Sequence, residues 1–130
     1  MEQSVIESGR AEFALKAVTS VVKEENDKTK KEYRSYVRSF PSLVLSNGLA
    51  AAVAFAREKG STNKTYMLIY CNISEWLASN KNLIDFTEKT NLDEYICSLD
   101  SDSYRIVSNE VLSLFKWLKR FASGQIAGES

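Results

Sequence analysis

The sequence predicts an all-α protein, a compact helical bundle of about five to six helices. Its 130 residues include only one proline and five glycines. Apolar residues recur at steps of three and four, the period of a helix, and do not alternate as in a half-buried strand. The length is that of one ordinary domain, and a hydrophobic fraction of 44% is enough for a core. We therefore expect a single all-α domain over residues 1–124 and a frayed C-terminal tail over residues 125–130.

The expected helices follow one another with short connections. Their ranges are residues 2–25, 27–39, 41–59 and 64–79, then a short helix capped by Asn91, and a last helix from about residue 102 to residue 123. The second helix ends at Phe40–Pro41, because a proline disfavours helical conformation in the residue before it and suits the first turn of a new helix. The turn Gly60–Asn63 closes the third helix.

The expected third helix has a face of small residues. Gly48, Ala52 and Ala56 lie at steps of four, and a glycine inside a helix costs about 1 kcal/mol relative to alanine. Two explanations remain open. Small side chains allow a neighbouring helix to approach closely, or they leave the backbone accessible to a ligand or partner. In the last helix, Trp117 is expected in the core, with a stacking platform for bases as the alternative.

The composition argues against an enzyme. The chain contains no histidine, the usual general base near neutral pH and the commonest metal ligand. It also lacks the glycine-rich phosphate loops GxxxxGK[ST] and GxGxxG. Cys71 and Cys97 are too few for a zinc site without histidine, and both lie in apolar runs, so we expect buried free thiols. We therefore expect no catalytic residues, no cofactor, no metal and no small-molecule substrate.

The sequence also argues against a membrane protein. The N-terminal residues lack the basic and apolar regions of a signal peptide. The longest apolar run, residues 48–56, is far shorter than the roughly 20 residues that span a bilayer. We expect a cytoplasmic protein with no membrane partner.

Positive charge is concentrated in two places, although 17 basic residues balance 17 acidic ones overall. Residues 28–38 hold five basic side chains and one acidic side chain, with Lys30, Arg34 and Arg38 spaced by four on one helical face. A second group, Lys116, Lys119 and Arg120, ends the last helix. Such groups are often solvated, and basic residues in a final turn complement the helix dipole. For the first group, phosphates as counter-ions would relieve the mutual repulsion, which favours nucleic-acid binding.

Negative charge is concentrated between Asp85 and Asp102, where six acidic residues accompany one lysine. This segment is either solvated or faces a basic neighbour. Because the basic and acidic groups lie in different parts of the chain, copies of the molecule could stack head to tail. In that case we expect Asp93, Glu94, Asp100 or Asp102 at a subunit contact.

Two longer motifs resemble one known family. Residues 38–49, Arg-Ser-Phe-Pro-Ser-Leu-Val-Leu-Ser-Asn-Gly-Leu, are similar to its R-x-F-P-x-x-x-x-x-N-G-L segment. Residues 110–122 are similar to its E-x-L-x-x-x-x-W-L-K-R-F-A ending. Both motifs occur in the expected order, and the likeness extends over nearly the whole chain. The family is the small subunit of the Cmr complex, the type III-B CRISPR–Cas effector.

The resemblance implies a non-catalytic subunit of an RNA-guided antiviral complex. Members stack in several copies beside the backbone subunit, and their basic face lines the channel where crRNA pairs with target RNA. The implied partners are therefore other Cmr subunits, neighbouring copies, crRNA and target RNA. The family's basic positions correspond here to Arg38, Lys119 and Arg120. A purely structural spacer between protein subunits, with little RNA contact, is the alternative.

Combining the resemblance with the charge pattern gives a set of seven candidate residues. The expected RNA-binding residues are Lys30, Lys31, Arg34, Arg38, Lys116, Lys119 and Arg120. We expect them to contact phosphates and not base edges, because such a complex accepts any target and leaves sequence recognition to base pairing with the guide.

Overall fold

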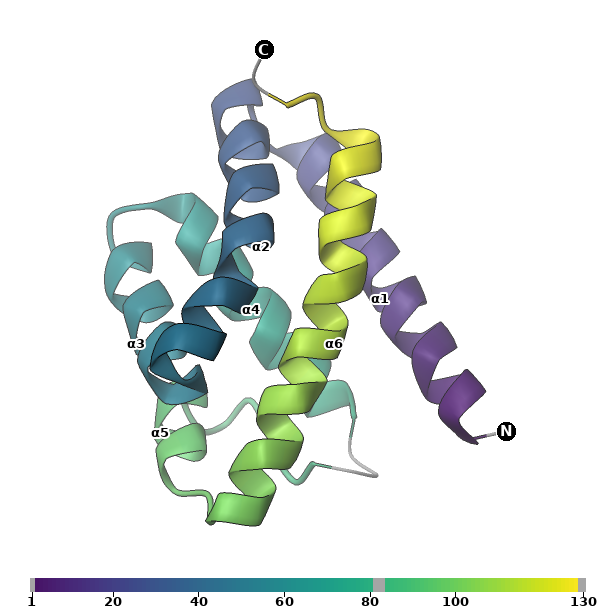
Figure 1. Cartoon of the computed structure of the whole chain (residues 1–130). Coiled ribbons are helices and arrows are strands. Elements are labelled where there is room, and N and C mark those ends of the chain that lie inside the picture. The colour runs from purple at the N-terminus through teal and green to yellow at the C-terminus, as the bar shows by residue number, and fades with distance from the viewer. Residues whose placement is uncertain (1, 81–83, 129–130) are drawn as a thin grey trace.

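The computed structural model describes residues 2–80 and 84–128, and for residues 2–8 it describes the backbone alone. Throughout this part of the chain the only regular elements are six α-helices (Figure 1). Their bounds are α1 Glu2–Glu24, α2 Asp27–Asn47, α3 Leu49–Gly60, α4 Lys64–Ser79, α5 Leu92–Cys97 and α6 Ser101–Gln125. The prediction of an all-α fold is confirmed.

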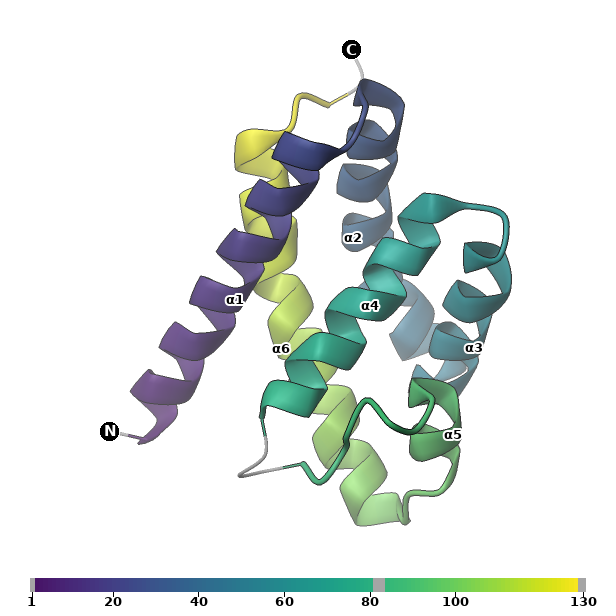
Figure 2. The same cartoon turned by 180° about the vertical axis from the view of Figure 1, so that it is seen from behind.

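The last helix, α6, is the central support of the fold. It runs antiparallel to α2 along one side and packs against α1 along the other (Figure 1). Seen from behind, α4 crosses the bundle next to α3, and the short α5 lies below them (Figure 2). The C-terminal end of α6 and the N-terminal end of α2 thus lie at the same end of the molecule.

One cluster of buried apolar side chains joins these helices. Phe40 of α2 stacks on Phe115 of α6, with ring centroids 4.9 Å apart. Buried Tyr33 donates a hydrogen bond of 2.6 Å to Asn72 of α4, which satisfies both polar groups inside the core. Trp117 is only partly buried, packs against this cluster and stacks on Phe121.

The boundary predicted at Phe40–Pro41 is wrong. α2 continues through Pro41 to Asn47, although a proline inside a helix costs about 3 kcal/mol. The packing explains the continuation, because Phe40 and Val44 are buried on the same side as the residues of the preceding turns. A break at Pro41 would remove these side chains from the core.

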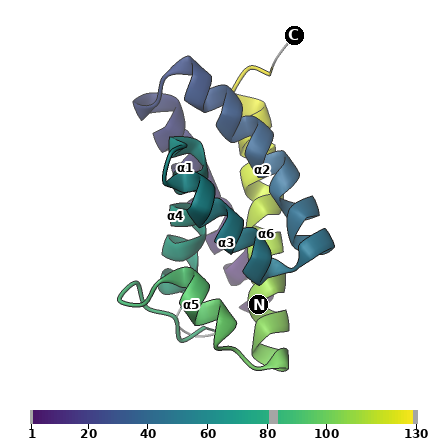
Figure 3. The same cartoon turned by 90° about the vertical axis from the view of Figure 1, so that its left-hand side faces the viewer.

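The chain breaks instead at Gly48, which the sequence analysis placed inside a helix. Gly48 has φ +89° and ψ 157°, a combination that is essentially restricted to glycine. After it, α3 runs back beside α2 (Figure 3). Tyr104 closes the junction, because its hydroxyl accepts a hydrogen bond of 2.9 Å from the backbone N–H of Ala50. Ala52 and Ala56 are fully buried, as expected of a closely packed helix face.

Polar caps mark the ends of several helices. Asn26, Asn63 and Asp100 accept hydrogen bonds from backbone N–H groups in the first turns of α2, α4 and α6. Asn91 precedes α5 as expected, but its side chain makes no capping bond. The N–H of the following residue, Leu92, donates instead to the hydroxyl of Tyr70.

A buried ion pair fastens α1 to α6. Arg10 donates from Nε and Nη2 to the two carboxylate oxygens of Glu110, at 2.8 and 2.9 Å. Trp76 of α4 donates from its indole N–H to the same carboxylate at 2.8 Å. Burial raises the pKa of the Glu110 carboxyl, but the bonds from Arg10 and Trp76 and the charge of Arg10 outweigh burial and hold the pKa below its ordinary value.

Two further expectations differ from the structure. Cys71 and Cys97 are free, as expected, but both are exposed and not buried. The C-terminal tail was expected from residue 125. Gln125 still belongs to α6, and Ile126 is buried in the core, with its N–H donating to the carbonyl of Ala122. Residues 129–130 of that expected tail lie outside the described residues.

Candidate nucleic-acid interface

The basic residues of α2 occupy the side of the helix that faces away from the core. Helical spacing makes this arrangement necessary, because Tyr33 and Val37 are fully buried on the opposite side. Lys31 and Arg38 are exposed, and Arg34 is half-buried. Together with Lys28 these residues line an open hollow of about 800 Å³ along the N-terminal half of the helix.

Lys30 does not line this hollow. Its ammonium group lies 3.3 Å from the carboxylate of Asp27, and its side chain is 26% exposed. Lys28, which the sequence analysis counted in the basic run but left out of the candidate site, lines the hollow in its place. Of the three residues spaced by four, Arg34 and Arg38 therefore line the hollow, and Lys30 is paired with Asp27.

The second basic group lies beside the first. α2 and α6 are antiparallel, and Phe40 of α2 packs on Phe115 of α6 (Figure 1). Because the helices run in opposite directions, the turn after Phe115 lies next to the turn before Phe40. This turn and the next carry the exposed residues Lys116, Lys119 and Arg120. Two groups about 80 residues apart in sequence therefore lie at the same end of the antiparallel pair.

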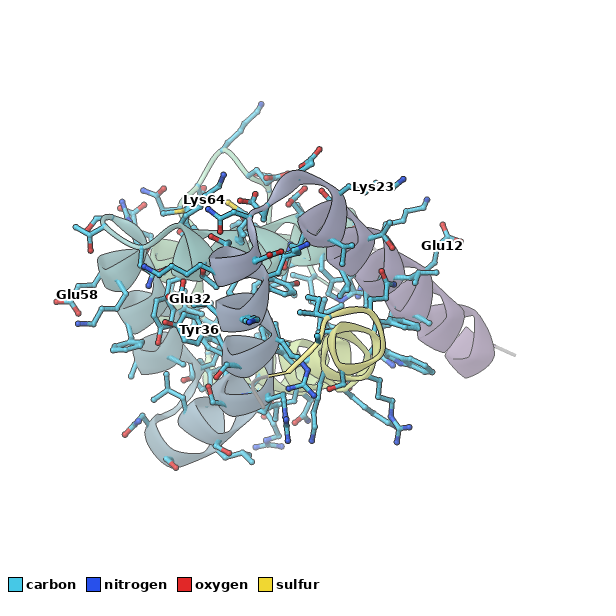
Figure 4. The ribbon with its side chains drawn as sticks, turned by 90° about the horizontal axis from the view of Figure 1, so that it is seen from above. Glu12, Lys23, Glu32, Tyr36, Glu58 and Lys64 are labelled. Atoms are coloured by element: carbon cyan, nitrogen blue, oxygen red, sulfur yellow. The ribbon has the colours of Figure 1, made fainter. Side chains whose placement is uncertain are left out.

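The one acidic residue within the basic stripe is held on its far edge. Glu32 accepts a hydrogen bond of 2.8 Å from the hydroxyl of Thr65 in α4. Tyr36, one turn later, stacks on Tyr66 with ring centroids 4.3 Å apart. Viewed from above, Glu32 and Tyr36 lie on the side of α2 that faces α3, away from α6 (Figure 4). Glu32 nevertheless still lines the hollow with the basic residues, as does Asp27.

Three exposed cations of the two basic groups have no anionic partners among the described residues. No carboxylate oxygen of the described residues lies within 4.0 Å of the basic nitrogens of Lys31, Arg38 or Lys119. Neighbouring cations without counter-ions repel one another, and phosphate groups are the ligands that relieve this repulsion most directly. The site suits a phosphate backbone better than a metal, and the described residues contain no cluster of metal-ligating side chains.

Two acidic candidates for a subunit contact are already engaged within the chain. Asp93 accepts from Arg57 at 2.8 Å, which ties α5 to α3. Asp100 caps α6, and its bond from the backbone of Ser103 lowers the pKa of its carboxyl. Glu94 is exposed, and Asp102 lies 3.9 Å from Arg105 on the surface.

The site also contains one residue with no signal in the sequence. Gly128, beyond the end of α6, lines the hollow next to Arg34. Nothing in the local sequence around Gly128 indicates this contact, because 94 positions separate the two residues.

None of the described helices is long and apolar enough to cross a membrane.

Comparison with known proteins identifies the family. The family model for a CRISPR-associated protein, Cas_Cmr5, matches residues 6–125. The chain belongs to the Cmr5 family. This is the family of the small subunit of the type III-B CRISPR Cmr complex, so the resemblance found in the two sequence motifs is confirmed.

A solved structure supports the same fold. The chain is similar to the X-ray crystal structure of a CRISPR-associated Cmr5 family protein from Thermus thermophilus. The two share 24% sequence identity, and the match covers 94% of this chain and 98% of that one with a TM-score of 0.76. The six-helix arrangement described above is thus the arrangement of a Cmr5 family member.

Proposed function

We propose that this Cmr5 family member binds the phosphate backbone of paired crRNA and target RNA through the adjoining basic groups of α2 and α6. The observation that carries the proposal is the position of these two groups at the same end of the antiparallel helix pair, where Lys31, Arg38 and Lys119 have no carboxylate partners among the described residues. Lys31, Arg38 and Lys119 are its exposed members. Phosphate contacts do not depend on base sequence, as an RNA-guided complex requires.

In this proposal the subunit contributes no catalytic step. The chain has no histidine, and the proposed phosphate contacts come from lysine and arginine side chains. Copies of the chain stack beside the backbone subunit in the cytoplasm, where the complex acts in antiviral defence. Glu94 and Asp102, two of the exposed carboxylates of the acidic segment, are proposed to meet a neighbouring subunit.

A second candidate is a structural spacer that holds protein subunits apart and barely touches RNA. The half-burial of Arg34 and the pairing of Lys30 with Asp27 favour it, because both reduce the number of cations available to phosphates. The two candidates differ in whether the exposed face of α2 contacts RNA in the assembled complex.

The deciding experiment replaces Lys31, Arg38 and Lys119 together by alanine in the full-length chain. Binding to single-stranded RNA of mixed sequence should weaken for all sequences, and the slope of log K against log salt should fall by about 2, at about 0.7 per lost phosphate contact. The matched control replaces Lys16, Lys23 and Lys64, three exposed lysines on α1 and α4, and should change the slope much less. Ultraviolet crosslinking in the assembled complex should place RNA on α2. An unchanged slope with no crosslink to α2 would favour the spacer.

A further inference from the structure

The C-terminal residues pass over one member of the basic surface. A Cβ atom on residue 128 would lie only 2.6 Å from Nη1 and 2.9 Å from Cζ of Arg34. A Cβ at this position would force the flexible tip of Arg34 to shift, whereas glycine lets it lie against the backbone. The guanidinium of Arg34 is therefore seated directly against the backbone of Gly128.

The segment that carries Gly128 is anchored independently. Ile126 is 6% exposed and belongs to the core cluster, and its N–H donates a bond of 2.9 Å to the carbonyl of Ala122. Two residues later the chain reaches Arg34. Because Ile126 is held by the core, Gly128 offers Arg34 a defined surface.

The guanidinium of Arg34 still has hydrogen-bond donors that could bind an anion. Its Nε is buried and makes no hydrogen bond with the described residues, yet Arg34 and Gly128 both line the hollow that Lys31 and Arg38 also line. Nη1, Cζ and Nη2 would all lie within 3.3 Å of a Cβ on residue 128. The guanidinium thus turns a face toward the glycine. Its N–H donors lie in the plane of the group, so covering one face leaves edge donors for a phosphate.

We infer that Ile126–Gly128 forms part of the RNA-binding surface and holds the guanidinium of Arg34 ready to bind a phosphate group of the RNA. Arginine is a flexible side chain, and ordering it on binding weakens affinity. A chain segment that orders Arg34 beforehand removes much of that loss. This inference rests on the proposed function and adds a third chain segment to its site.

The test uses the full-length chain and a fluorescein-labelled single-stranded RNA of mixed sequence. Gly128→Ala should weaken binding roughly three- to tenfold, because the added methyl displaces Arg34 from its seat. Gly124→Ala is the matched control, since a Cβ there meets nothing within 4 Å, and it should bind as the native chain does. Arg34→Ala should weaken binding at least as much as Gly128→Ala. The double variant should bind no more weakly than Arg34→Ala alone, because both changes remove the same contact.

A second measurement reads the contact itself. In the native chain the Nε–H of Arg34 should exchange slowly with water in NMR spectra, and Gly128→Ala should accelerate that exchange while the melting temperature stays close to that of Gly124→Ala. Native affinity or tighter binding in Gly128→Ala would overturn the inference, and tighter binding would mean that the segment shields Arg34 from RNA. If Arg34→Ala loses affinity for RNA and Gly128→Ala does not, the inference about Ile126–Gly128 is refuted and the proposed function is not. A native chain that fails to bind RNA refutes the proposed function as well.

Discussion

The ion pair between Arg10 and Glu110 gives a sharp test of what holds α1 in place. The carboxylate of Glu110 is 4% exposed and the guanidinium of Arg10 is 16% exposed, so both charges are largely removed from water. Replacing Glu110 by alanine takes away two oxygens that accept from Arg10 and the acceptor of the indole N–H of Trp76. Breaking a buried pair costs about 3–5 kcal/mol. The partial exposure of Arg10 places this one near the lower end, about 3 kcal/mol.

That loss should leave a folded but weakened protein. Domains are typically stable by about 5–15 kcal/mol, and at this length 1 kcal/mol corresponds to roughly 3–4 °C in melting temperature. Glu110→Ala should therefore melt about 10 °C below the native chain. Urea unfolding followed by far-UV circular dichroism measures the free energy directly, and an unchanged slope with denaturant would show that the unfolded state is the same.

The same pair predicts a dependence on pH. The pKa of Glu110 is lowered in the folded state, so its contribution is complete above the ordinary glutamate pKa of about 4.3 and is lost as pH falls through the folded pKa. Glu110→Gln is the control, because its amide oxygen still accepts from Trp76 but carries no charge to titrate. This variant should lose less stability than Glu110→Ala at neutral pH and should be less sensitive to acid than the native chain. If Glu110→Ala loses less than about 1 kcal/mol, the value of an exposed pair, the reasoning is wrong.

Two further predictions concern other parts of the fold. Gly48→Ala should destabilise the protein by about 1–3 kcal/mol in urea unfolding, because φ +89° with ψ 157° strains any residue with a Cβ. The control Gly124→Ala should not destabilise the protein. Equal stability of the two variants would contradict this account of the α2–α3 junction. Burial, with the hydrogen bond to Asp85, raises the pKa of Tyr95 to about 12. Its contribution to stability is therefore complete below the ordinary tyrosine pKa of about 10 and is lost as pH rises toward that of the folded state. Unfolding midpoints should fall more steeply over this range in the native chain than in Tyr95→Phe, and parallel curves would count against the shift.

Sequence periodicity was a good guide wherever local and tertiary preferences agree. The all-α fold and the breaks near residues 25 and 60 follow from short-range rules that apply within one or two turns. The boundary at Pro41 was predicted wrongly because local and tertiary preferences conflict there. Burial of Phe40 and Val44 outweighs the local cost of the proline. The true break depends on Gly48, and nothing local shows that the chain needs a positive φ there.

The exposure of Cys71 could have been predicted from the helical period. It lies two positions after buried Ile69, on the opposite side of α4. An apolar run in sequence is therefore a weaker indicator of burial than the helical period. The exposure of Lys31 and Arg38, opposite buried Tyr33 and Val37, follows the same period. The half-burial of Arg34 was not predictable, since it depends on Gly128 across the fold.

The position of α6 bears on how the protein folds as it is made. α1 packs against α6, and Arg10 and Glu110 are 100 residues apart in sequence. While the ribosome is still synthesising the middle of the chain, the apolar side of α1, with Ala14, Val18 and Val21, lacks its main partner, α6. Contacts between such distant residues slow folding and leave hydrophobic surface open to aggregation in the meantime. α1 therefore cannot complete its packing until translation has passed α6.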